Sequence, residues 1–144
     1  MAEALPVTRA DIEAAHARIA AHVRRTPVIA PGRGAFGLDL DLVLKLECLQ
    51  HMGSFKSRGA FNSLLSCVVP EAGIAAASGG NHGAAVAYAA QRLGHRATIF
   101  VPEISSPVKI ARIRQSGADV QVGGARYADA AAACSAFRER TGAI

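Results

Sequence analysis

The chain has 144 residues, of which 51% are hydrophobic and 5% aromatic, with 14 glycines and no tryptophan. This length suffices for one domain with a hydrophobic core, and the composition favours close-packed helices on a parallel sheet over a β-sandwich. The formal charge of +5 favours small anionic ligands, such as phosphates and carboxylates. Because the basic residues are scattered and no DNA-reading motif is present, no nucleic-acid partner is expected.

The three cysteines, Cys48, Cys67 and Cys134, lie at wide spacings and form no Cys-x-x-Cys pair. They are expected to be free buried thiols in a reducing compartment, which predicts a cytoplasmic location. The N-terminus lacks the features of a signal peptide, and no apolar run approaches membrane-spanning length. The histidines form no close pair with metal-site spacing, so no metal is predicted.

The first expected helix begins after Thr8, a suitable N-cap. Its apolar stripe is formed by Ile12, Ala15, Ile19 and Val23. His16 and His22 lie off this stripe and are expected to be solvated. The helix must end before Thr26, because a residue that precedes proline avoids the α conformation.

Residues 42–47 alternate in the manner of a strand, and residues 61–65 carry apolar side chains at helical spacing. Lys56, within the stretch SFKSRG at 54–59, is therefore expected where a strand has ended and a helix begins. The positive field of a helix N-terminus disfavours a protonated amine, so Lys56 is a candidate nucleophile for a Schiff base. The alternative is a solvated lysine in a first turn, which is the usual state of lysine.

The rest of the chain alternates short apolar strands with helices. Strands are expected at 73–77, 97–101 and 119–122, and helices at 84–93, 107–116 and 127–140. Gly94, Gly117 and Gly142 follow the helices, where glycine commonly ends a helix. Strands and helices joined by short loops predict an open parallel α/β sheet with helices on both faces.

A glycine-rich turn, SGGNHG at residues 78–83, follows the first of these strands. Ligands bind beyond the carboxyl ends of strands in open α/β sheets. Gly79, Gly80 and Gly83 remove side chains and allow unusual dihedral angles, so backbone N–H groups could form a nest for a carboxylate. Asn81 adds an amide that can donate to a ring hydroxyl without titrating. The alternative is a tight connection that needs glycine for the turn alone.

Three stretches together resemble the serine/threonine dehydratase family: LKLECLQ at 44–50, GSFKSRGA at 53–60 and SGGNHG at 78–83. These are pyridoxal-phosphate enzymes of the tryptophan-synthase-β fold, also called fold type II. Shorter stretches also match, namely Thr26-Pro27, Val101-Pro102-Glu103, Lys109-Ile110 and Gly117-Ala118. Cysteine-synthase relatives are a poorer match, because they differ around the lysine and lack the Asn-His pair.

The resemblance implies roles for individual residues. Lys56 would attach the cofactor, pyridoxal 5'-phosphate, while Phe55 would hold its ring and Asn81 would hydrogen-bond the ring hydroxyl. The substrate carboxylate would be bound, mainly through backbone N–H groups, by Ser78, Gly79, Gly80, Asn81 and His82. His82 could instead be a polar cap, and Ser54 could contact the cofactor or cap the helix. Arg58 is expected to be a surface or salt-bridging residue.

The implied reaction is β-elimination of L-threonine or L-serine to a 2-oxo acid and ammonia, with the freed Lys56 amine as the base that removes the Cα proton. One alternative is a serine racemase-type enzyme with Ser78 as its acid. Another is a non-catalytic ligand-binding or oligomerisation domain. The sequence does not distinguish serine from threonine as the substrate.

Members of this family are considerably longer, and in them the residues that grip the cofactor phosphate lie beyond the position of Ile144. The chain is therefore expected to be a truncated or partial form of a homodimeric enzyme, with an unpaired sheet edge and an exposed apolar face. Residues 1–40 would be an N-terminal helix and loop of the larger family domain. Residues 41–144 would form the small α/β domain.

Overall fold

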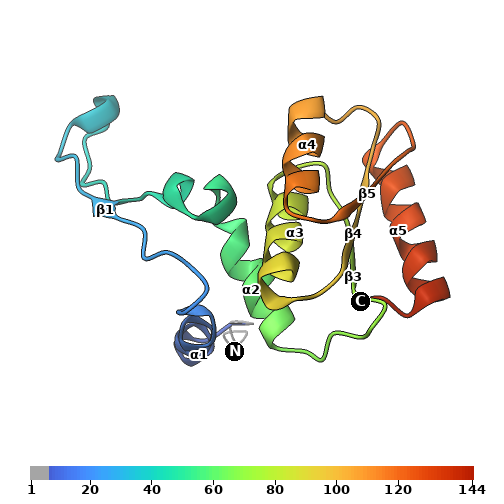
Figure 1. The fold of residues 1–144 in the computed structure, drawn as a ribbon. Coiled ribbons are helices and arrows are strands. Elements are labelled where there is room, and N and C mark those ends of the chain that lie inside the picture. The colour runs from blue at the N-terminus through green and yellow to red at the C-terminus, as the bar shows by residue number, and fades with distance from the viewer. Residues whose placement is uncertain (1–6) are drawn as a thin grey trace, which may run out of the picture.

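A computed structural model describes residues 7–144 and contains a parallel sheet of three strands with helices packed on it (Figure 1). The strands β3 (Ile74–Ala77), β4 (Ala97–Val101) and β5 (Asp119–Val122) are hydrogen-bonded in the order β3-β4-β5. Helices α3 (Asn81–Leu93) and α4 (Pro107–Gln115) cover one face, and α5 (Tyr127–Thr141) packs on β3 and β4 from the other. The predicted open parallel sheet with helices on both faces is confirmed.

The alanine content of α3 explains how this helix lies between the sheet and α2 (Lys56–Leu65). Ala85 and Ala89 have no exposed surface, and Phe61 of α2 is 1% exposed. Small side chains allow close approach on both sides of the helix without voids. A second, smaller core of Phe100, Ala130 and Cys134 lies between the sheet and α5.

Upstream of α2, the chain forms α1 (Arg9–Ile19) and a two-stranded ribbon of β1 (Val28–Ile29) and β2 (Leu44–Lys45). The predicted strand at 42–47 is therefore too long. Its strand residues pair antiparallel with β1, outside the parallel sheet. This pairing joins residues on the two sides of the domain boundary predicted after residue 40, and the boundary itself stays a prediction.

Helix α1 confirms the predicted cap but not the predicted stripe. The Thr8 hydroxyl accepts a hydrogen bond from the Asp11 N–H group at 3.2 Å. The helix ends at Ile19, which is buried, whereas Ile12 is 61% exposed. The prediction of a solvated His22 is wrong, because its ring stacks on Phe61 with the centroids 5.2 Å apart.

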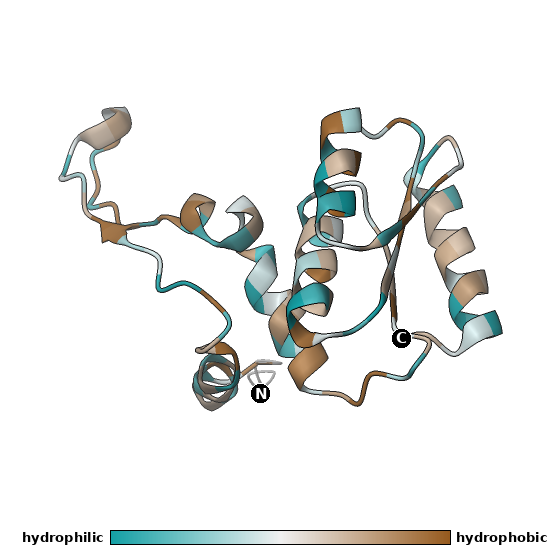
Figure 2. Ribbon diagram, in the orientation of Figure 1, coloured by the Kyte–Doolittle hydropathy of each residue, from teal (hydrophilic) through white to brown (hydrophobic). Residues whose placement is uncertain are grey.

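Apolar side chains are exposed over residues 28–43, which project from the rest of the chain (Figures 1 and 2). They include Val28, Ile29, Phe36, Leu38, Leu40 and Val43. The three cysteines are free, as predicted, but Cys48 and Cys67 are exposed rather than buried. Within residues 7–144, no helix is long and apolar enough to span a membrane.

Candidate active site

Lys56 is the first residue of α2, so the predicted helix start is confirmed. Between strand β2 and this helix, the chain forms two 3₁₀ turns, η2 (Glu47–Leu49) and η3 (His51–Gly53). Met52 has a φ of 57°, a conformation that costs free energy for a residue with a side chain and must be held by its surroundings. The buried Ser57 hydroxyl holds this turn by donating to the His51 carbonyl at 2.6 Å.

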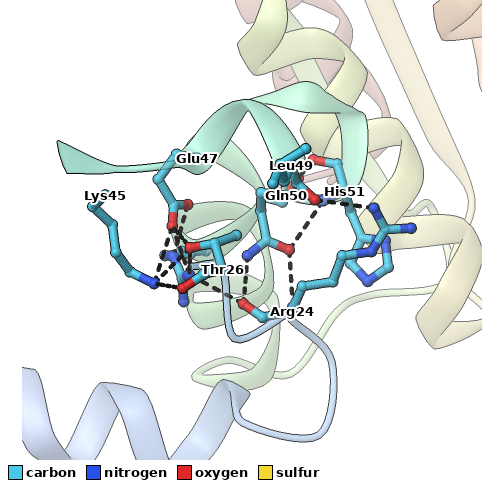
Figure 3. Close-up of polar contacts among 9 residues, drawn as sticks. Arg24, Thr26, Lys45, Glu47, Leu49, Gln50 and His51 are labelled. Atoms are coloured by element: carbon cyan, nitrogen blue, oxygen red, sulfur yellow. Dashed lines mark hydrogen bonds and ion pairs between the residues drawn. The ribbon is translucent and has the colours of Figure 1, made fainter. Parts of the chain in front are cut away.

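Gln50 ties the segment before Lys56 to the end of the N-terminal region (Figure 3). Its side chain is 2% exposed, accepts from the Arg24 N–H group at 2.9 Å and donates to the Arg24 carbonyl at 2.9 Å. The same side-chain oxygen accepts from the His51 N–H group at 3.0 Å. These part-buried hydrogen bonds hold the loop before Lys56 both to Arg24 and to His51.

Arg58 forms a salt bridge, as predicted for this residue. Its Nε and Nη2 atoms donate to the two carboxylate oxygens of Glu47, at 2.9 and 2.7 Å. Hydrogen bonding from Arg58 holds the pKa of Glu47 below its ordinary value, although partial burial opposes this effect. Thr26 adds a third bond, from its hydroxyl to Glu47 Oε1 at 2.6 Å. This network fixes α2 immediately after the lysine.

Lys56 lines a cavity of about 460 Å³ between α2, α3 and the edge of β3. The Lys56 Nζ atom is 4.9 Å from the centroid of the Phe55 ring, a cation–π distance. His82, from the start of α3, lines the same cavity. Apolar side chains complete the wall, among them Leu64, Ala76, Val86 and Ile144. The structure therefore brings Lys56, Phe55 and His82 together from two helix beginnings.

The pKa of His82 is lowered, first by partial removal of its ring from water and then by the positive charge of Lys56. The imidazole is therefore neutral at neutral pH and can accept or donate a hydrogen bond. Ser78, Gly79, Gly80 and Asn81 form the adjoining turn at the carboxyl end of β3 and do not line the cavity. The roles predicted for the site residues stay predictions.

Two glycines of this turn, Gly79 and Gly83, are needed for close approach and not for dihedral freedom. A positive φ is found at none of the three glycines Gly79, Gly80 and Gly83, so the expectation of unusual dihedral angles is wrong. A Cβ atom on Gly79 would lie 2.1 Å from the Ser105 hydroxyl oxygen, and one on Gly83 would lie 2.1 Å from the Ser78 carbonyl oxygen. Gly80 has room, with its nearest neighbour 3.9 Å away.

Backbone donors remain available at this turn. The N–H groups of Asn81, His82 and Gly83 have no hydrogen-bond partner among residues 7–144, whereas the Ala84 N–H group donates to the Gly80 carbonyl at 3.2 Å. Free donors at a helix N-terminus, together with the helix dipole, favour an anion. This arrangement is the geometry that the predicted carboxylate nest requires.

The Ser54 hydroxyl, two residues before Lys56, lacks a hydrogen-bond partner, and this is an independent observation on the site. The residue is 7% exposed, and its hydroxyl oxygen is buried without a hydrogen bond from any described residue. The N-cap of α2 is Phe55, and no side chain caps this helix, so the capping alternative for Ser54 is wrong. A buried hydroxyl without a partner is costly, and a polar ligand would satisfy it. The residues around Lys56 fit an aromatic aldehyde with polar substituents.

Residues 19–144 match the family described as pyridoxal-phosphate dependent enzyme. The chain belongs to this family, whose cofactor is pyridoxal phosphate. Its sequence is 38% identical over 136 residues to an L-threonine ammonia-lyase of Geobacter sulfurreducens, covering 92% of this chain and 34% of that protein.

Two solved structures show the same fold as this chain. A threonine deaminase from T.th. superposes with a TM-score of 0.83 at 40% identity, over 95% of this chain and 44% of that one. Maize serine racemase superposes with a TM-score of 0.82 at 33% identity, over 92% of this chain and 41% of that one. The chain spans about a third of the length of the curated relatives it matches, 34% in the L-threonine ammonia-lyase. The predicted family and fold are confirmed.

Proposed function

We propose that this chain is the lysine-bearing part of an enzyme that deaminates L-threonine or L-serine to a 2-oxo acid and ammonia. The observation that carries the proposal is that Lys56 and His82, from two helix beginnings, line the same 460 Å³ cavity, with the Lys56 amine 4.9 Å from the centroid of the Phe55 ring. The relatives named as L-threonine ammonia-lyase and threonine deaminase support this reaction.

Pyridoxal phosphate, when bound, supplies an electron sink for the negative charge that develops at the amino-acid Cα atom. Lys56 would hold the cofactor covalently and, once released by the substrate amine, would take the Cα proton. Phe55 would support the ring, and Asn81 would donate to its hydroxyl. The free N–H groups at the start of α3 would bind the substrate carboxylate. A neutral His82 would add no positive charge to compete with Lys56.

The assembly and location of the enzyme are also part of this proposal. An amino-acid substrate agrees with the name of the L-threonine ammonia-lyase, and a cytoplasmic location agrees with the free thiols. The homodimeric full-length form is proposed from the family resemblance alone. A racemase is the second candidate, because maize serine racemase superposes as well as the threonine deaminase does. In this chain the Ser78 hydroxyl accepts from the Gly80 N–H group at 3.2 Å, which leaves its own proton free to donate.

Borohydride trapping tests the proposal. The chain is mixed with pyridoxal phosphate, reduced, digested and analysed by mass spectrometry. We expect a reduced adduct on Lys56, loss of this adduct in Lys56→Ala, and no loss in Lys109→Ala, which removes an exposed lysine on α4. Equal labelling of Lys56 and Lys109 would contradict a dedicated site. Release of a 2-oxo acid from L-threonine supports the deaminase, whereas formation of a D-amino acid supports the racemase.

A further inference from the structure

A second cavity, of about 640 Å³, lies between the end of α1 and the start of α2. Its walls are formed by His16, Ala20, Val23, Arg24, Arg25, Lys45 and Arg58. None of these residues lines the Lys56 cavity. Arg58 follows Lys56 by two residues on one helix, which places the two side chains about 200° apart around the axis. The two cavities therefore lie on different sides of α2.

The walls of this second cavity carry more positive charge than the surrounding residues neutralise. Four of them are arginine or lysine, and the neighbouring carboxylate is that of Glu47. Glu47 pairs with Arg58 at 2.7 Å and lies 3.9 Å from Lys45. Among residues 7–144, Arg24 and Arg25 form no ion pair. A concave surface with excess charge of one sign concentrates ions of the opposite sign.

Two of the four cations are held in place and still have N–H groups to donate. Lys45 Nζ donates to the carbonyl and the hydroxyl of Thr26, both at 2.5 Å, which leaves one of its three protons free (Figure 3). Arg58 binds Glu47 through Nε and Nη2, and its Nη1 atom has no partner among the described residues. Donors fixed before binding reduce the entropy lost on binding.

Arg24 and Arg25, the two other cations of this cavity, make fewer side-chain hydrogen bonds than Lys45 and Arg58 do. Arg24 uses one Nη1 bond to the Leu49 carbonyl at 3.0 Å, and Arg25 makes no side-chain hydrogen bond to a described residue. Both are exposed residues that line the cavity. We propose that this cavity binds a small molecule carrying a phosphate group, because a phosphate accepts bonds from several directions and matches the fork of a guanidinium group. The proposal does not depend on the chemistry at Lys56.

The test is a ¹⁵N NMR titration of the chain with inorganic phosphate and, separately, with glycerol 3-phosphate, with chloride adjusted to hold the ionic strength constant. We expect saturable shifts at residues 24, 25, 45 and 58. Arg25→Ala removes charge-assisted hydrogen bonds and should weaken binding about tenfold or more. Arg114→Ala, which removes the same charge from an exposed position on α4, should leave the affinity unchanged. Tighter binding of glycerol 3-phosphate would support contact of its carbon chain with Ala20 and Val23.

Several outcomes would overturn the proposal. One is unchanged affinity in Arg25→Ala, and another is an equal loss in Arg114→Ala, which would indicate a general charge effect. Phosphate-induced shifts at Lys56 and His82 instead of residues 24 and 25 would place the anion in the other cavity. Shifts that never saturate would indicate screening. Because Arg25 is exposed and makes no side-chain bond, its substitution should leave the fold intact, which the same spectra report.

Discussion

At the scale of single residues, burial and the positive charge of Lys56 both lower the pKa of His82. The pKa of His82 is lowered from 6.5, with burial as the larger cause and Lys56 as the smaller. In Lys56→Ala the second cause disappears, so we expect the pKa of His82 to rise but to stay below 6.5. The pH titration of the His82 ring protons by NMR measures this change.

The same residue-scale packing decides which glycines of the turn can be replaced. In Gly83→Ala the new Cβ atom would meet the Ser78 carbonyl oxygen at 2.1 Å, and the backbone must move to relieve the contact. We expect a loss of about 2 kcal/mol or more in the free energy of unfolding. Gly80→Ala is the matched control and should change it by no more than about 0.5 kcal/mol, since its nearest neighbour is 3.9 Å away. Urea unfolding measures both, and equal losses would contradict the steric argument.

At the scale of elements, the Glu47–Arg58 pair joins η2 to α2 and makes stability depend on pH. The folded chain lowers the pKa of Glu47, chiefly through Arg58, so the unfolded chain binds the proton more readily. The stabilisation is therefore complete above the ordinary pKa of 4.5 and is lost as the pH falls below it. Glu47→Gln should lose about 1–2 kcal/mol at pH 7 and show a weaker acid dependence.

The control for this prediction is Glu13→Gln. Glu13 pairs with Arg9 on α1 at 2.7 Å, but both side chains are mostly exposed, at 64% and 92%. An exposed pair four residues apart on a helix contributes about 0.3–0.5 kcal/mol. Urea unfolding between pH 3 and pH 7 compares the two variants. If both variants lost the same free energy of unfolding, the partly buried network around α2 would contribute no more to stability than the exposed pair on α1.

At the scale of the whole molecule, the edge of the sheet at β3 is partly covered. The Ile144 N–H group donates to the Gly73 carbonyl at 3.1 Å, and the Ala75 N–H group donates to the Ile144 carbonyl at 2.7 Å. These two bonds follow the parallel pattern on either side of Ile74. The β3 edge is therefore partly paired, whereas at the other edge β5 pairs only with β4 among the described strands, which agrees with the expected unpaired edge. The expected exposed apolar side chains are present over residues 28–43.

Deletion of residues 143 and 144 tests the importance of this edge pairing. The Ala75 amide loses its acceptor, so its hydrogen exchange should become faster. Ile99, in the central strand β4 between β3 and β5, is the internal reference and should keep its protection. Exchange followed by NMR separates the two amides. Unchanged exchange at Ala75 would show that the pairing contributes no protection.

The sequence by itself determined the features that depend on neighbouring residues. Its periodicity placed the strands at 73–77, 97–101 and 119–122, of which the first begins one residue later in the structure. Its motifs placed Lys56 at a helix beginning and identified the enzyme family. These features are local because hydrophobic periodicity and helix capping act over a few residues.

Only the tertiary structure decided which distant segments meet. It paired β2 with β1 rather than with the sheet, set Ser105 against Gly79, and left the Ser54 hydroxyl without a partner. It also brought His82 to Lys56 and gathered four cations between α1 and α2. A residue pattern shows which face of an element is buried, but the partner of that face depends on the packing of the whole chain.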